Sequence, residues 1–262
     1  WGAWAERFMV RLLVGKGAVR QASNRDGSDQ SLQWAAVAEF NRALLRAEQI
    51  CCANPSNRSV RLLAIDSRIR LSRALAAADP ARRREAIGIN VGAREDAEAL
   101  VAQQPLLAGA RTLRALAVRG HATFIRADWR FSESGTGLDD AVAAMGDVLK
   151  HDPELGSGHT FLPETLVTRA EQHWTLGRFG AAEADLRAAI GMWNHPTTPP
   201  NAHLLLVRGH EILARVLAAT GRDRDADDQL ALADAVFARV LAGRPWLGGA
   251  GRAMLEVQRD LR

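Results

Sequence analysis

The segment from Thr165 to Pro196 constrains the fold most, because it holds two amphipathic runs separated by a single glycine, Gly177. After that glycine, small and apolar residues recur at spacings of three and four, which is the period of a helix. Two helices joined by a short glycine turn form a helix-turn-helix hairpin. The positions that carry this spacing are Phe179, Ala182, Leu186 and Ala189.

Two further segments of the chain repeat parts of this pattern. In the first, Gly221 is the turn glycine, and Asp223 stands where the earlier segment has an aromatic residue. Its small and apolar positions are Ala214, Ala226, Leu230 and Ala233. The second, LDDAVAAMGDVLKHDPE, matches only the second helix of the hairpin, through Ala141, Met145, Val148 and Pro153.

These hairpins resemble the tetratricopeptide repeat (TPR), a pair of helices of about 34 residues. That family has a small residue in its first helix, glycine at the turn and alanine where the two helices cross, which Ala170, Gly177 and Ala182 match. Small residues are needed there because they let two helices approach closely while larger neighbours interlock. The resemblance covers roughly the last half of the chain. It implies an all-α, right-handed superhelical solenoid of about four TPR-like hairpins with flanking helices.

The composition is that of an ordered globular protein. The chain has 262 residues, of which 47% are hydrophobic and 24% are charged, so disorder is not expected. Because a stack of hairpins does not have to divide, residues 1–262 are predicted to be a single TPR-like domain. Within it we expect an N-terminal helix and loop (1–30), degenerate hairpins (31–160), the best-matching repeats (161–242) and a C-terminal capping helix (243–262).

Helix boundaries follow from periodicity and from turn residues. Helices are expected over residues 1–21, 32–52, 56–78, 80–104 and 107–131, and another that opens at Asp139 or Asp140. Loops are expected at 23–31, 132–137, 156–164 and 192–203, with turns near residues 28, 79, 136, 177 and 221. In the first helix the apolar stripe is expected to be Trp1, Trp4, Ala5, Phe8 and Leu12.

No apolar run approaches the roughly 18 residues of a membrane span, and no signal peptide is visible. Since the first residue is Trp1 rather than Met, we expect an excised domain. The sequence leaves the compartment open: a cytoplasmic location is slightly favoured, and the periplasmic sensor domain of a membrane protein is the alternative.

Catalytic and cofactor motifs are sparse. His203, His210 and Glu211 are the best metal candidates, but seven residues between the histidines spread them about 10 Å along a helix. The glycine-rich GRPWLGGAG lacks the Lys-Ser/Thr pair that a phosphate loop requires. The adjacent Cys51 and Cys52 predict no disulfide and have no histidine nearby in the sequence. We therefore expect no enzyme activity and no cofactor.

Charge is distributed unevenly along the chain. From Ser56 to Arg84, eight arginines and two aspartates give a net charge of +6. This segment is interpreted as a solvated helix face, with a basic patch for an acidic partner or nucleic acid as the alternative. From Gly221 to Val240, five aspartates outnumber three arginines, so the two ends of the array differ in sign.

In the family that the chain resembles, the first helices of the hairpins line a concave groove that binds a partner's peptide or helix. Transferring that register places nine residues in the groove: Arg126, Arg130, Glu164, Val167, Glu171, Trp174, Arg208, Glu211 and Arg215. Trp174 among arginines suits an interface anchor, because Trp and Arg dominate interface hot spots. The alternative is that Trp174 packs between adjacent hairpins.

The sequence therefore predicts a non-catalytic interaction or sensory module for a protein or peptide partner, and an acidic partner is one expectation. Similar bacterial arrays are fused to signalling proteins such as membrane-anchored serine/threonine kinases. The alternatives are a freestanding scaffold, an RNA-binding helical repeat and, last, a metal-dependent enzyme. Nucleic acid is not expected, because no side chains repeat at fixed groove positions. The oligomeric state is not indicated.

Overall fold

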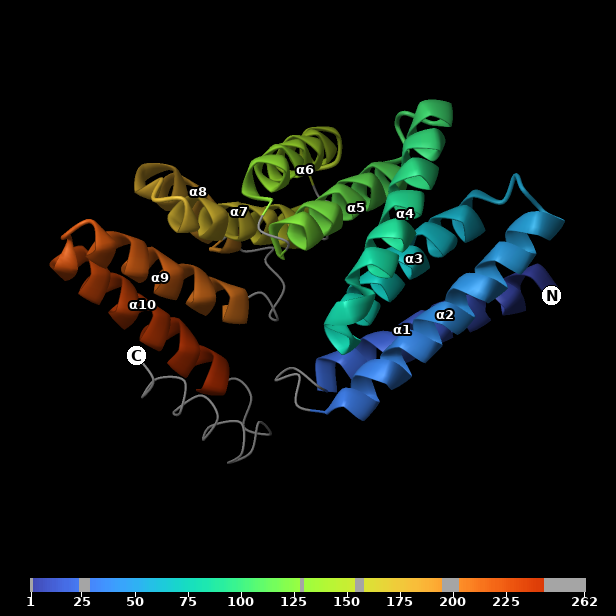
Figure 1. The fold of residues 1–262 in the computed structure, drawn as a ribbon, viewed down its shortest axis with the longest axis horizontal. Coiled ribbons are helices and arrows are strands. Elements are labelled where there is room, and N and C mark those ends of the chain that lie inside the picture. The colour runs from blue at the N-terminus through green and yellow to red at the C-terminus, as the bar shows by residue number, and fades with distance from the viewer. Residues whose placement is uncertain (1, 24–28, 128–129, 154–157, 195–202, 243–262) are drawn as a thin grey trace. The chain divides into compact units, whose positions relative to one another are not determined.

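The computed structural model describes residues 2–23, 29–127, 130–153, 158–194 and 203–242 (Figure 1). Every regular element within these ranges is helical and none is a strand, which confirms the predicted all-α class. Contacts group the chain into two units, Trp1–Glu154 and Leu155–Arg262, and each is described by itself. The single-domain organisation stays a prediction. None of the helices in the described ranges is long and apolar enough to cross a membrane.

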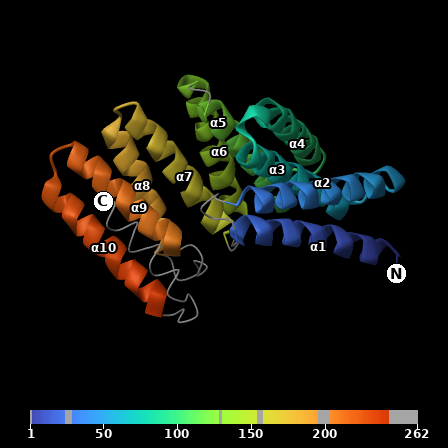
Figure 2. The same ribbon diagram turned by 60° about the horizontal axis from the view of Figure 1, so that its bottom comes forward.

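In the first unit each helix packs against the next one along the chain (Figure 2). Its core is formed by inward-facing side chains such as Phe40, Leu44 and Leu75. The elements are α1 (Gly2–Ser23), α2 (Gln30–Ala53), α3 (Arg58–Ala78), a 3₁₀ turn (Pro80–Arg82), α4 (Arg83–Gln103), α5 (Ala108–Ala127) and α6 (Phe131–His151).

The apolar stripe predicted for the first helix does not face the core at Phe8 and Leu12, and the side chains of Trp1, Trp4 and Ala5 lie outside the described part of the structure. Phe8 and Leu12 are 53% and 41% exposed, whereas Val10 is fully buried in the core with α2. The reason is Gly17, where a Cβ atom would lie only 2.6 Å from the ring of Phe40. A bare glycine lets α2 approach this side of α1, so the opposite side, with Phe8 and Leu12, faces outward.

The loop predicted at residues 132–137 is also wrong, and with it the turn near 136. α6 begins at Phe131, and these residues form its first turns. The hydroxyl of Ser134 donates a hydrogen bond to the carbonyl oxygen of Ala122 at 2.9 Å. A Cβ atom on Gly137 would lie 3.0 Å from that of Ala122, so the glycine permits close approach to α5. Packing on α5 therefore outweighs the low helix propensity of the glycines and serines.

The second unit contains α7 (Gly158–Thr175), α8 (Phe179–Trp193), α9 (His203–Ala219) and α10 (Asp223–Ala242), which pack in the order α7–α8, α8–α9 and α9–α10. The loop predicted at 156–164 is wrong from Gly158 onward, although Pro163 lies inside α7. A proline removes one backbone hydrogen bond. Here Pro163 is itself buried, and the buried Leu166 and Val167 follow it, so burial of the helix compensates.

Both predicted turn glycines are confirmed. Gly177 and Gly221 have φ angles of 70° and 75°, a left-handed conformation that only glycine adopts without strain. After Gly177, the amide of Arg178 donates to the carbonyl of His173 at 2.8 Å, and Arg222 makes the same bond to Leu217 at 3.0 Å. These bonds close both helix ends in a Schellman motif.

The small residues predicted at the helix crossings are buried. Ala170, Ala182, Leu186 and Ala189 are fully buried in the α7–α8 hairpin, and Ala214, Ala226 and Ala233 are buried in the α9–α10 hairpin. Ala141, Met145 and Val148 are likewise buried in α6. The central part of the linker predicted at 192–203, the GRPWLGGAG segment and the predicted C-terminal capping helix lie outside the described residues.

Candidate functional site

Three of the predicted groove residues lie on α9, and one of them connects two hairpins. The guanidinium of Arg208, 60% exposed, forms an ion pair with Glu171 of α7. Glu171 was predicted in the same groove, so the structure brings these two residues together. Because Glu171 lies in the α7–α8 hairpin, this pair joins consecutive hairpins as well as lining their surface.

Two other predicted residues present unengaged surface. Trp174, in the last turn of α7, is 38% exposed. Arg215 of α9 is exposed and makes no hydrogen bond or ion pair with any residue that the structure describes. Val167, predicted on the same surface, is instead buried under its neighbours. The outward-facing part of the predicted groove in the second unit is therefore Glu171, Trp174, Arg208, Glu211 and Arg215.

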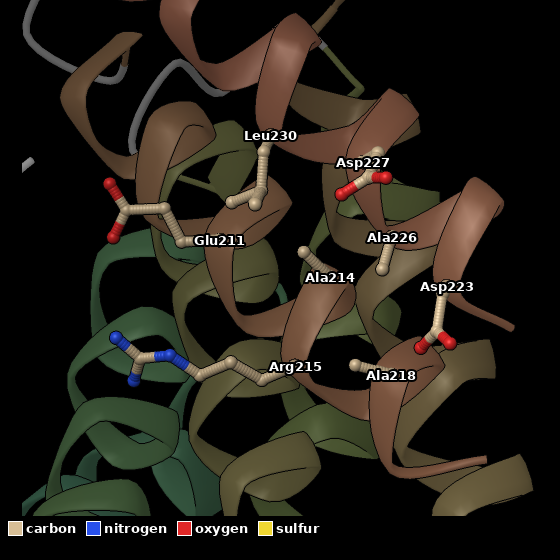
Figure 3. A pocket seen from close by; sticks show the side chains of 8 residues that line it. All are labelled: Glu211, Ala214, Arg215, Ala218, Asp223, Ala226, Asp227 and Leu230. Carbon is tan, nitrogen blue, oxygen red and sulfur yellow. The ribbon is translucent and has the colours of Figure 1, made fainter. Parts of the chain in front are cut away.

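A groove of about 570 Å³ lies between α9 and α10 (Figure 3). Glu211 and Arg215 stand on its α9 side, and Asp223 and Asp227 stand on its α10 side. The floor between them is apolar and is made of Ala214, Ala218, Ala226 and Leu230. Three carboxylates against one guanidinium make the rim acidic, so it favours a basic occupant with a small apolar face.

A second ion pair joins the two hairpins of this unit at the turns. Arg222, just after Gly221, donates to both carboxylate oxygens of Glu183 at 3.0 and 2.9 Å. Hydrogen bonds from Arg187 and Arg222 hold the pKa of Glu183 below its ordinary value, although partial burial opposes them. Glu183 is thus ionised at neutral pH and engaged by the following hairpin.

Glu164, the other predicted groove residue of α7, is half-buried. The last two predicted groove residues belong to the first unit. Arg126 is half-buried in the last turn of α5. Arg130 follows α5 at the N-terminal cap of α6, where its guanidinium binds Glu133 in the first turn of that helix. Arg130 therefore does not lie on the helix to which the sequence register assigned it. The assignment failed because it placed the turn near residue 136.

Of the predicted metal candidate, the structure describes the side chains of His210 and Glu211. His210 is buried, and its Nδ1 atom lies 2.9 Å from the amide oxygen of Gln229 on α10. The side chain of His203 lies outside the described part of the structure. No group of three or more metal-ligating side chains occurs within the described ranges. Cys51 is half-buried, and burial raises the pKa of its thiol, which opposes nucleophilic reactivity.

The basic segment from Ser56 to Arg84 is largely engaged within the first unit. Arg61 and Arg68 both reach α4, through Gln103 at 2.7 Å and through Asp96. Arg70 binds Asp66 on its own helix. Other arginines of the segment are also engaged: Arg68 binds Glu48 as well, and Arg82 binds Glu85 and lies over the ring of Trp34. This geometry favours the solvated-face interpretation over a nucleic-acid patch.

Comparison with solved structures places this arrangement among helical repeats. BtubC (BKLC) from P. vanneervenii matches with a TM-score of 0.58 at 12% identity, over 90% of this chain and 92% of that one. A putative kinesin light chain from Podosopora anserina, with nearly identical TPR-like repeats, matches with a TM-score of 0.54 at 17% identity, over 88% and 97% of the two chains. The chain has a TPR-like repeat fold. No protein-family model matches its sequence, and none of the curated proteins does.

The TPR-like register explains a feature that sequence reasoning missed, namely the groove between α9 and α10. The two hairpins of the second unit repeat at 44 residues, since Gly177 corresponds to Gly221. At this spacing Trp174 corresponds to Ala218, and Phe179 corresponds to Asp223. Two bulky aromatic residues are thus replaced by small or acidic ones, which opens the groove. The sequence signal for this groove was Asp223, which stands where the preceding hairpin has the aromatic Phe179.

Proposed function

We propose that this TPR-like chain is a non-catalytic protein-interaction module. It binds a partner protein or peptide on the surface of α7 and α9 that carries Glu171, Trp174, Arg208, Glu211 and Arg215. The observation that carries the proposal is an exposed tryptophan on the same unit as an arginine that no described residue engages. Tryptophan and arginine contribute most to binding energy in protein interfaces.

The geometry supports a peptide or helix as the ligand. Stacked helical hairpins present extended surfaces built from several elements, which suits long partner segments better than small molecules. In this surface Trp174 supplies apolar area, while Arg215 supplies a charge for a carboxylate. We propose that the partner places an apolar side chain on Trp174 and an acidic one on Arg215.

Two finer proposals rest on the sequence resemblance. The first is that Arg126 and Arg130 of the first unit also contact the partner. The second is that the chain serves within a larger bacterial signalling protein, such as a serine/threonine kinase. A freestanding scaffold is the alternative, and the gene region upstream of Trp1 distinguishes the two. An RNA-binding repeat is disfavoured, because the equivalent positions Glu171 and Arg215 carry opposite charges and so provide no repeated code.

The test is affinity capture from lysate of the source organism, quantified for wild type, Trp174→Ala and Arg215→Glu. Leu176→Ala is a matched control, because Leu176 has the same 38% exposure as Trp174. It follows Trp174 by two residues, a rotation of about 200° about the helix axis, so it points to the other side. We expect a protein that wild type and the control retain and that both test variants lose. The purified partner should then bind Trp174→Ala at least tenfold more weakly, which corresponds to about 1.4 kcal/mol.

Equal retention by all four proteins would contradict the proposed surface. Thermal unfolding of each variant is the necessary control. Both substituted side chains are partly or fully exposed, so their melting temperatures should match that of wild type. A lower melting temperature for Trp174→Ala would instead mean that this tryptophan packs between hairpins.

A further inference from the structure

On the α9–α10 hairpin, the face equivalent to the one that α9 covers on the preceding hairpin is partly exposed among the described residues. On α8, Leu186 and Trp193 are buried, and α9 packs against this helix. At the 44-residue spacing their counterparts on α10 are Leu230 and Phe237, and both remain partly exposed. We call this surface, together with the groove that it borders, the acceptor face. Its residues are Glu211, Ala214, Ala218, Asp223, Ala226, Asp227, Leu230 and Phe237.

The way α9 covers α8 shows what the acceptor face is shaped to receive. Gly209 of α9 lies over Trp193 and Ile190, where an added Cβ atom would come within 3.2 and 3.3 Å of their side chains. Leu206 and Leu213 flank this glycine at spacings of three and four, and both are buried. The covering helix thus contributes a stripe of the form leucine, glycine, leucine, with the glycine at the point of closest approach.

A stripe with the same spacing, but with valine in place of the second leucine, occurs on α1, where it is exposed. Leu12, Gly15 and Val19 have the spacing of Leu206, Gly209 and Leu213. Leu12 is 41% exposed and Val19 is 65% exposed, and a Cβ atom on Gly15 would meet nothing within 4 Å. Phe8, one turn before Leu12, extends the stripe and is also exposed. We call this stripe, with the exposed Arg11 and Lys16 beside it, the donor face.

The two faces are complementary in charge. The donor face carries Arg11 and Lys16. The acceptor face carries three carboxylates, those of Glu211, Asp223 and Asp227, against the single guanidinium of Arg215. In the contact of α9 with the α7–α8 hairpin the covering helix is likewise basic and the covered hairpin acidic, because Arg208 forms an ion pair with Glu171. The equivalent positions are Val14 and Arg215, so the proposed contact would place its charges at other positions. Shape at the stripe and charge at its edge therefore point to one occupant.

We propose that a second copy of this chain occupies the acceptor face, with α1 of one copy docked on the α9–α10 hairpin of the other as α9 docks on α7–α8. The contact uses different surfaces on the two copies, so it is heterologous. A pair therefore still has one free acceptor face, on the copy that supplied α1, and one free donor face, on the other copy. Association of this kind continues into a filament unless the rotation between copies closes a ring.

The test uses sedimentation velocity on the full chain and two blocked variants. Leu12→Glu places a charge in the donor stripe, and Ala218→Arg places a long side chain in the groove. Both original side chains are exposed, so folding should be retained. The matched controls are Leu45→Glu, at an exposed leucine of α2, and Ala219→Arg, at the exposed neighbour of Ala218.

We expect wild type and both controls to sediment faster as concentration rises, and each blocked variant to remain monomeric. An equimolar mixture of the two blocked variants retains one intact donor and one intact acceptor face. It should form a dimer and nothing larger. If the substitutions only disturbed folding or association in general, the mixture would also stay monomeric. A dimer in the mixture therefore shows that each substitution blocks one face and leaves the other intact.

Wild type that stays monomeric at all concentrations would overturn the proposal. Removal of residues 243–262 would then show whether this chain's own C-terminal segment occupies the face, since association would appear only in the shortened protein. A mixture of blocked variants that stays monomeric would also overturn it. If either blocked variant unfolds, hydrogen exchange of wild type replaces it: protection must rise with concentration in α1 and in α9–α10 together.

Discussion

The two hairpins of the second unit have the same backbone design but use different side-chain contacts. Both turns place a glycine at positive φ and close with the same pair of hydrogen bonds. In α7–α8, Arg169 binds both carboxylate oxygens of the largely buried Asp185, at 2.8 and 2.7 Å. The position equivalent to Asp185 is Gln229, which instead contacts His210 at 2.9 Å. The first hairpin thus uses an ion pair at this position, and the second uses a contact between an amide and an imidazole.

The hairpins differ more on their outer faces. α9 covers α8, and the ion pairs of Arg208 with Glu171 and of Arg222 with Glu183 join the edges of that contact. The same face of α9–α10 is a groove with an alanine floor and an acidic rim. The comparison shows that a few small residues at the crossing and one glycine at the turn determine the backbone of the hairpin. The residues around them determine whether its face is covered by the chain or remains open for another molecule.

The largest expected difference between the hairpins comes from their equivalent leucines. Leu186→Ala removes a fully buried side chain and should lower the free energy of unfolding by about 2–5 kcal/mol. Leu230→Ala removes a partly exposed one and should cost less than about 2 kcal/mol. Urea unfolding of both variants at low protein concentration measures the difference. Equal losses would mean that the face of α10 is as well covered as that of α8.

Overpacking at the crossings should give a smaller difference in the same direction. Ala182→Leu forces three carbons into a closed crossing and should destabilise the protein by about 1–3 kcal/mol. Ala226 borders the groove, so a leucine there can extend into free space and should cost no more than about 1 kcal/mol. Thermal unfolding of the pair distinguishes them. A more costly change at Ala226 would show that the groove is not available to side chains.

The smallest expected effect concerns the pH dependence of the turn ion pair. Because the pKa of Glu183 is lowered in the folded state, its contribution is present above the unfolded pKa and is lost as pH falls through the folded pKa. Glu183→Gln should therefore destabilise by at most about 1 kcal/mol at neutral pH and by nothing in acid. Asp227→Asn, at the equivalent position, is the control, and it should not change the stability at either pH. Melting curves at the two pH values check this. If Glu183→Gln lowered the melting temperature equally at both, the ion pair would not be the source of the pH dependence.

The sequence predicted the parts of the fold that depend on local pattern. Gly177 and Gly221 could be identified as turns because a positive φ requires glycine there. The small crossing residues could be identified because their spacing is helical. By contrast, the loops predicted at 132–137 and 156–164 contain Gly137 and Pro163, and both residues lie inside helices. Local propensity failed at these two positions because packing on a neighbouring helix compensates for it, and that packing is not visible in one segment.

The candidate site was less predictable than the fold. Trp174 and Arg215 were found from the repeat register, and the structure places them on outward-facing surface. Phe8 and Leu12 of α1 were predicted as an apolar stripe, but their exposure was missed, since an apolar face alone does not tell which side of a helix its neighbour covers. In α1 that choice depends on Gly17 and Phe40, which lie in different helices. To predict the groove from the sequence, the two hairpins would have had to be compared residue by residue.

The most direct test of the covered and open faces is the rate of thiol labelling at Leu186→Cys and Leu230→Cys. Cys51 and Cys52 are first replaced by alanine, so each protein carries one thiol. At low protein concentration the thiol at position 230 should react at nearly the rate of a free cysteine. The thiol at position 186 should react only as fast as the protein opens. Equal protection of the two thiols would contradict the account, because the last hairpin would then have no open face.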